Sequence, residues 1–115
     1  MSKLYFRYGA MSSGKTAALL QVAHNYERQG MTIVLVKPSI DTKAEEKVSS
    51  RLGIERPVDV LLAPTDRLID KMEPIKPHAI IVDEAQFLTP EQVDELYVIT
   101  KAYDIPVLCY GLRCD

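Results

Sequence analysis

The stretch that decides the fold runs Gly9-Ala10-Met11-Ser12-Ser13-Gly14-Lys15-Thr16. It has the form G-x-x-x-x-G-K-T, follows an apolar run at Lys3–Tyr8 that is typical of a strand, and precedes a helical pattern at Ala17–Arg28. A phosphate-binding loop requires this strand–loop–helix context, in which Lys15 reaches the β- and γ-phosphates and Thr16 places its hydroxyl on Mg²⁺. The glycines let the backbone curl, so that N–H groups turn toward an anion at the helix N-terminus. The alternative is a glycine- and serine-rich turn that only caps a helix.

Length and composition indicate one domain. The 115 residues are 47% hydrophobic and 26% charged, which is ordinary for a globular protein. The net charge of -2 provides no basic field for nucleic acid, and no apolar run approaches the length of a membrane span. The N-terminus lacks the apolar core of a signal peptide, and two cysteines do not make a disulfide framework. We therefore expect a cytoplasmic protein that binds neither membranes nor nucleic acid.

Apolar runs alternate with helical patterns along the chain. Four successive residues at Ile33–Val36 are aliphatic, mostly β-branched, which predicts a strand covered on both faces and hence a parallel sheet. We expect strands at Leu4–Tyr8, Thr32–Lys37, Val58–Leu62, Ala79–Val82 and Pro106–Tyr110, and helices at Ala17–Gln29, from Thr65 to about Lys71 and from Pro90 to about Ala102. The fold class predicted is α/β, resembling P-loop nucleoside triphosphatases, with a mostly parallel sheet and helices on both faces.

Turn and cap residues mark the predicted boundaries. Thr89 is expected to cap a helix, with a proline at the first helical position and Gln92 completing a capping box. Thr65 is expected to cap the preceding helix, and Gly111 to turn the chain out of the last strand. The polar segment Ser39–Arg51 is expected to be a mobile surface loop with at most a helical turn.

A second motif delivers two carboxylates to the end of a predicted strand. The segment Ile80-Ile81-Val82-Asp83-Glu84 places them where open α/β sheets bind ligands. Asp83 suits Mg²⁺, and Glu84 could orient an attacking hydroxyl and accept its proton. The alternative is a pair of acids solvated at a strand end. Asp-Glu-Ala-Gln also occurs in nucleic-acid helicases and other ATPases, where the glutamate polarises water, so this motif does not separate a kinase from a hydrolase.

Four segments occur in a characteristic order: Tyr8–Thr16, Lys37-Pro38-Ser39-Ile40-Asp41-Thr42, Asp83-Glu84-Ala85-Gln86-Phe87 and Cys109-Tyr110-Gly111-Leu112-Arg113. Together they resemble the bacterial branch of the type II thymidine kinases, relatives of the human cytosolic enzyme. The resemblance covers the whole chain. It implies transfer of the γ-phosphate of ATP to the 5′-hydroxyl of thymidine or deoxyuridine, a step of nucleotide salvage for DNA synthesis.

The resemblance also implies roles for individual residues. Gly9–Thr16 would hold the triphosphate, Glu84 would be the general base, Asp83 the metal carboxylate, and Gln86 part of the ATP side. Two further implied roles belong to apolar residues, since Met11 and Phe87 match the wall of the nucleoside site.

The segment after the second predicted strand carries two more implied contacts. Asp41 matches an acidic residue close to the metal and phosphates. Lys43 stands where the family commonly has arginine, so it keeps the charge but loses the bidentate fork.

The chain departs from the family pattern near its end. Cys114 stands where threonine is expected, and the phenylalanine that packs on the nucleobase, the thymine-binding lasso and the four-cysteine zinc site would follow Asp115. We therefore expect residues 1–115 to be a single ATP-binding domain of such an enzyme, with the kinase activity assigned to the parent protein. The family resemblance suggests a homotetramer with ATP and thymidine as its substrates.

Two other functions remain open from the residues. One is a small helicase-like P-loop ATPase, and the other is a non-catalytic nucleotide-binding module. Several reactive residues receive no role: Cys109 is expected in the core, and His24 and His78 at surface or core positions. Arg51 and Arg113 are equally consistent with phosphate contact and with an ordinary surface role.

Overall fold

The computed structural model describes residues 3–9, 13–39, 47–49 and 55–112, without side chains at 8–9, 13–16, 47–49, 55 and 112. The described helices and strands are β1 (Leu4–Gly9), α1 (Ser13–Arg28), β2 (Ile33–Pro38), β3 (Lys47–Ser49), β4 (Glu55–Pro57), β5 (Val60–Leu62), α2 (Leu68–Met72), β6 (Ala79–Val82), the 3-10 turn η1 (Ala85–Phe87), α3 (Pro90–Ala102) and β7 (Val107–Leu112). The strands form a five-stranded parallel sheet and a separate two-stranded hairpin.

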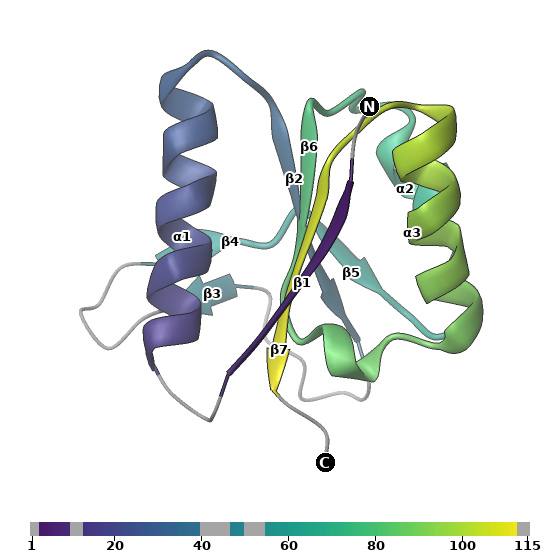
Figure 1. Ribbon diagram of the computed structural model, residues 1–115, viewed down its shortest axis with the longest axis horizontal. Coiled ribbons are helices and arrows are strands. Elements are labelled where there is room, and N and C mark those ends of the chain that lie inside the picture. The colour runs from purple at the N-terminus through teal and green to yellow at the C-terminus, as the bar shows by residue number, and fades with distance from the viewer. Residues whose placement is uncertain (1–2, 10–12, 40–46, 50–54, 113–115) are drawn as a thin grey trace.

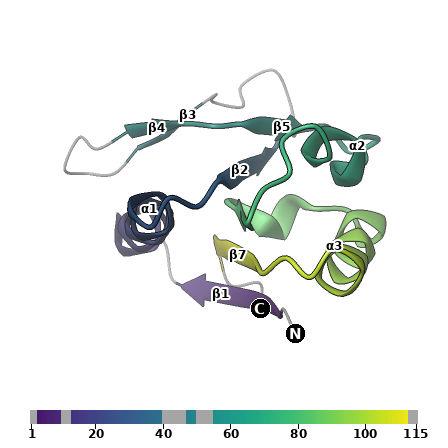
Figure 2. The same cartoon turned by 90° about the horizontal axis from the view of Figure 1, so that it is seen from above.

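The parallel sheet has the order β1-β7-β6-β2-β5, and helices cover both of its faces. Helix α1 lies on one face, whereas α2 and α3 lie on the other (Figures 1 and 2). From β1 through β2 to β5 the chain moves from one edge strand of the sheet to the other. From β5 through β6 to β7 it moves back toward β1. Because crossovers between parallel strands are right-handed, reversing the direction moves the connecting helices to the opposite face. The predicted α/β class, parallel sheet and two-sided helical cover are confirmed.

Two apolar clusters, one on each face, explain the unbroken aliphatic runs. Alternate residues of β2 divide between them: Val34 and Val36 join the cluster under α2 and α3, whereas Ile33 and Leu35 join the cluster under α1. The same alternation occurs in β6 and β7. Since successive side chains of a strand point to opposite faces, a strand buried on both faces must be apolar at every position.

The segment after β2 differs from the predicted loop. Lys47–Ser49 and Glu55–Pro57 pair as an antiparallel hairpin, β3–β4, and the next strand of the main sheet is only Val60–Leu62 rather than Val58–Leu62. Arg56 ties this hairpin to the rest of the fold, because its guanidinium contacts Glu27 of α1 at 2.8 Å and Asp59 at 3.2 Å. Asp59 is only three residues from Arg56, but Glu27 is 29 residues away on another element, so the local pattern carried no sign of that second contact.

The predicted cap at Thr65 is wrong. The residues before α2 instead form a turn in which the Asp66 N–H donates to the Ala63 carbonyl and the Asp66 carboxylate accepts from the Ala63 N–H. The helix begins only after Arg67, which has an extended backbone and no side-chain cap hydrogen bond. The first backbone N–H groups of α2, those of Leu68 and Ile69, donate to the carboxylate of Glu95 on α3.

The boundaries of α3 and β7 test two further predictions. The capping box at Thr89 and Gln92 is present in full, and Pro90 occupies the first position of α3, as predicted. Gly111 does not turn the chain out of the last strand; it lies inside β7 and pairs with Tyr8. In the part of the chain described, no helix has both the length and the apolar character that crossing a bilayer requires.

Candidate active site at the carboxyl edge of the sheet

The register of the parallel strands brings the two sequence motifs to one edge. Cys109 of β7 is level with Phe6 of β1 on one side and with Val82 of β6 on the other. All three strands run in the same direction, so the residues that follow them emerge at the same carboxyl edge, the lower edge in Figure 1. Strand β7 separates β1 from β6, which puts their ends about 10 Å apart laterally. That is the edge at which open α/β sheets bind ligands.

The glycine-rich motif begins at the end of the edge strand. Strand β1 ends at Gly9, and α1 begins at Ser13, so the backbone of Gly14, Lys15 and Thr16 already belongs to the first turn of the helix. The N–H groups of a first helical turn have no partner within the helix and can bind an anion. Ala10, Met11 and Ser12, and the side chains of Lys15 and Thr16, lie outside the part of the structure described.

Asp83 follows β6 directly and is 5% exposed. Its backbone N–H donates to the Val36 carbonyl at 2.8 Å, which extends the β2–β6 pairing by one residue. One carboxylate oxygen, Oδ1, accepts from the Glu84 N–H at 2.9 Å. The backbone of Asp83 is therefore held against β2, and its carboxylate is held by the next backbone N–H. A carboxylate is the kind of ligand that Mg²⁺ prefers.

Glu84 adopts a left-handed backbone, with φ 56° and ψ 42°. A non-glycine residue rarely takes this conformation, and it costs about 1–3 kcal/mol where the surrounding structure imposes it. The turn sends the chain into η1, where the Phe87 N–H donates to the Glu84 carbonyl at 3.1 Å. The Gln86 amide Nε2 donates to Glu84 Oε2 at 2.8 Å. The two acidic residues thus lie in a tight, hydrogen-bonded turn, and not in a solvated strand end.

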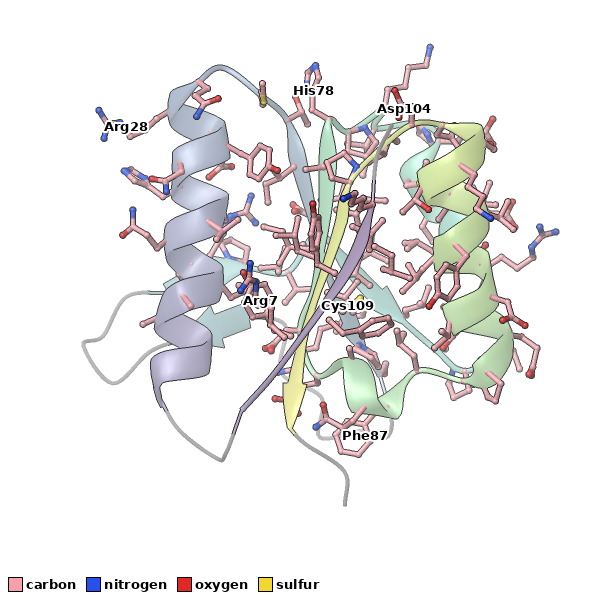
Figure 3. All side chains as sticks on the ribbon, in the orientation of Figure 1. Arg7, Arg28, His78, Phe87, Asp104 and Cys109 are labelled. Atoms are coloured by element: carbon pink, nitrogen blue, oxygen red, sulfur yellow. The ribbon has the colours of Figure 1, made fainter. Side chains whose placement is uncertain are left out.

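Phe87 stands at the end of this turn. Its ring is 45% exposed, and Figure 3 shows it at the carboxyl edge, below η1. An exposed aromatic ring beside a polar turn is suited to contact a flat ligand. Two other predicted site residues, Asp41 and Lys43, lie outside the described residues. The segment that carries them leaves β2 at this same edge, where the Ser39 N–H donates to the Leu62 carbonyl at 2.8 Å.

Sequence reasoning missed the position of Gly111 beside this site. The residue lies in β7, between the strands that carry the two motifs, and η1 packs directly on β7. A glycine within a strand pattern often marks a close approach of another segment, and this signal was available in the sequence.

The residues that received no functional role are, where described, in the core, at the opposite edge of the sheet or on the outside of α1. Cys109 is buried in the core, and burial raises the pKa of its thiol to about 12. His78 lies at the opposite edge of the sheet, where its Nδ1 accepts from the Thr32 N–H at 2.9 Å (Figure 3). His24 is exposed on α1. Arg51, Arg113 and Cys114 fall outside the described residues.

The described residues contain no group of three or more histidine, cysteine or acidic side chains that could hold a metal ion. They do include the buried carboxylate of Asp83 at the sheet edge. Mg²⁺ is usually bound in proteins through one or two carboxylates, substrate phosphates and water.

Comparison with known proteins links the whole chain to one family. A family model described as thymidine kinase matches residues 2–115. The chain is 43% identical over 117 residues to a thymidine kinase of Streptococcus gordonii, 41% identical over 121 residues to one of Enterobacteria phage T4, and 45% identical over 120 residues to one of Escherichia coli K12. Each alignment covers 100% of this chain but only 61%, 62% and 58% of the respective relative. The chain thus spans about three fifths of the length of these relatives.

Proposed function

This chain belongs to the thymidine kinase family, and from that membership we propose that the intact protein transfers the γ-phosphate of ATP to the 5′-hydroxyl of thymidine or deoxyuridine. The product with thymidine is dTMP. The observation that carries the proposal is the common carboxyl edge, to which β1 brings the glycine-rich motif and β6 brings Asp83 and Glu84.

The triphosphate is assigned to the loop between β1 and α1. Backbone N–H groups of Gly9–Thr16 bind phosphate oxygens, and the Lys15 ammonium reaches the β- and γ-phosphates. Asp41, Lys43 and Gln86 are proposed to complete the ATP side of the site. The start of α1 at Ser13 supports this assignment, because it leaves the first-turn N–H groups at the sheet edge.

Phosphoryl transfer depends mainly on positioning and charge compensation. Glu84 is proposed to orient the 5′-hydroxyl and to accept its proton as the oxygen attacks phosphorus. Asp83 and the Thr16 hydroxyl would hold Mg²⁺, which when bound offsets the negative charge of the phosphates. The hydrogen bonds that hold Asp83 and Glu84 in their turn support roles that require fixed geometry.

The nucleoside is proposed to lie against Met11 and Phe87. The exposed ring of Phe87 at the carboxyl edge supports this placement. Residues 1–115 are proposed to form one ATP-binding domain of a cytoplasmic enzyme that assembles as a homo-oligomer. The free thiol of Cys109 is consistent with a reducing compartment.

The test is ADP formation from ATP and Mg²⁺ by the intact protein, measured with thymidine, with single-stranded DNA and with neither. We expect thymidine to stimulate ADP release, with formation of an equal amount of dTMP. Release stimulated by DNA and indifferent to thymidine would instead identify a helicase-like ATPase. Tight ATP binding by a folded sample without turnover under any condition would identify a non-catalytic nucleotide-binding module.

A further inference from the structure

The 3-10 turn that follows Glu84 lies against β7 at a position with no side chain. A Cβ atom built on Gly111 would stand 2.5 Å from Gln86 Oε1 and 3.3 Å from the backbone nitrogens of Ala85 and Gln86. Because Val107 and Cys109 face the cluster under α3, position 111 faces the same side, where η1 packs. The Gln86 amide therefore fills the space that a side chain at residue 111 would need.

The same amide contacts the candidate base. Gln86 Nε2 donates to Glu84 Oε2 at 2.8 Å, within hydrogen-bonding distance for a charge-assisted pair. At its other end Glu84 is held by its own backbone, since its N–H donates to Asp83 Oδ1 at 2.9 Å and its φ of 56° fixes the direction of the turn. Glu84 is thus held both at its backbone and at its carboxylate.

We propose that Gly111 and Gln86 are positioning residues for Glu84. The missing side chain at 111 leaves room for the Gln86 amide on β7, and the amide holds the Glu84 carboxylate in one orientation. The inference rests on the proposed role of Glu84 as the base that accepts the hydroxyl proton. It gives Gln86 a function in the transfer step, separate from the contact with ATP suggested by the family resemblance.

The expected effect is on the rate of transfer. A displacement of about 1 Å in a positioned group can cost about 100-fold in rate. When the amide is lost, one hydrogen bond that orients the Glu84 carboxylate is removed, and a smaller part of its population remains productively placed. We expect Gln86→Ala to lower kcat by about 10- to 100-fold, in addition to any change in the KM for ATP that follows from loss of its contact with the nucleotide.

Gly111→Ala tests the same positioning of Glu84 by displacing the Gln86 amide instead of removing it. The nearest atom to the new methyl group is the tip of a flexible side chain, so the Gln86 amide moves aside while β7 keeps its place. The backbone nitrogens at 3.3 Å need shift only slightly. The variant should fold and should show the same loss of kcat as Gln86→Ala. Gln86→Glu, which keeps the size of the side chain but places a carboxylate against Glu84, should lose as much.

The decisive experiment is a double-mutant cycle in kcat with the intact protein. Residues that act through one another give non-additive effects. In a Glu84→Gln background, we expect neither Gln86→Ala nor Gly111→Ala to lower kcat further. In a Gln86→Ala background, Gly111→Ala should cost nothing more, because the amide that it displaces is gone. Gln21→Ala is the matched control, since it removes another glutamine amide donor, at 2.9 Å from Asn25 Oδ1 on the exposed face of α1.

The possible results are distinct. Absence of thymidine-dependent turnover in the unmodified protein would refute the proposed function, and this inference with it. If the unmodified protein is active, additive losses in the Glu84→Gln background would refute the positioning role alone. So would an unchanged kcat in Gln86→Ala, whatever happens to the KM for ATP, because the Gln86 amide would then not act through the base.

Discussion

Glu95 of α3 caps the start of α2 through Leu68. The Glu95 Oε1 atom accepts from the Leu68 N–H at 2.8 Å, and Oε2 accepts from the next backbone N–H, that of Ile69, at 3.0 Å. The Glu95 side chain is only 9% exposed, and the residue at the N-cap itself, Arg67, makes no side-chain cap hydrogen bond. One carboxylate thus provides both the cap of a short helix and the contact between two helices.

Replacing this carboxylate should destabilise the fold. Glu95→Ala leaves the two N–H groups at the start of α2 without their partner, and loss of such a cap costs about 1–2 kcal/mol. Urea denaturation should show a lower midpoint at unchanged slope. The neighbouring variant Asp94→Ala serves as control, because Asp94 is exposed and should cost less than about 0.5 kcal/mol. Equal stability of the two variants would contradict the capping role.

Arg56 should contribute more to stability than a typical surface arginine. Its side chain is 18% exposed and contacts both Glu27 and Asp59, and Asp59 Oδ2 also accepts from the Leu35 N–H at 2.8 Å. Burial alone would lower the pKa of Arg56, but the hydrogen bonds and charges of Glu27 and Asp59 raise it. We expect Arg56→Ala to lower the free energy of unfolding by about 1–2 kcal/mol, because it leaves two carboxylates without their shared partner.

The comparison for Arg56 is Arg67→Ala. Arg67 is 69% exposed and lies 3.9 Å from Glu95, so its ion pair should contribute less than about 1 kcal/mol. Thermal denaturation of both variants at low and high salt measures the difference. A larger loss for Arg67→Ala, or no loss for Arg56→Ala, would show that the hairpin β3–β4 is not held by these contacts.

Variants of Lys15 and Glu84 should affect different steps, ATP binding and phosphoryl transfer respectively. Lys15→Ala is expected to weaken binding of ATP with Mg²⁺, because it removes the cation that reaches the β- and γ-phosphates. Glu84→Gln is expected to spare ATP binding and to lower the transfer rate by about 10²- to 10⁴-fold, as for loss of a positioned acid–base group. Calorimetric titration with an ATP analogue and single-turnover kinetics measure the two effects. The assignment is overturned if Glu84→Gln abolishes binding while bound ATP still reacts at the normal rate.

Cys109 should make stability depend on alkaline pH. Burial raises the pKa of its thiol from 9.0 to about 12, so the unfolded chain loses this proton first as the pH rises. The stability contributed by the neutral thiol is fully present below pH 9.0 and is lost as the pH rises toward 12, by up to about 1.4 kcal/mol per pH unit. Denaturation between pH 8 and 10.5 should show a steeper decline for the unmodified protein than for Cys109→Ala. Parallel declines would mean that the thiol is not buried as described.

Local pattern was sufficient to predict most of the fold. The aliphatic residues at Ile33–Val36 and Ala79–Val82 predicted buried parallel strands, because only strands covered on both faces are apolar at every position. The capping box at Thr89 and Gln92 was predicted for a similar reason, since its partners are three residues apart. The true start of α2 was missed, because the carboxylate that caps it lies on α3. Strand β3 was missed because its three residues, Lys47–Ser49, contain no apolar run.

The two motifs to which we assign the chemistry, Gly9–Thr16 and the acidic pair Asp83 and Glu84, are each contiguous and could be found from the amino-acid order alone. Two other facts became visible only in the folded chain: β7 lies between the strands that carry the motifs, and Gly111 leaves room for the Gln86 amide beside Glu84. The physical reason is the separation along the chain of the residues that interact. Propensity, capping and strand burial act between neighbours in the chain, whereas strand order and the space beside a glycine depend on which distant segments pack together.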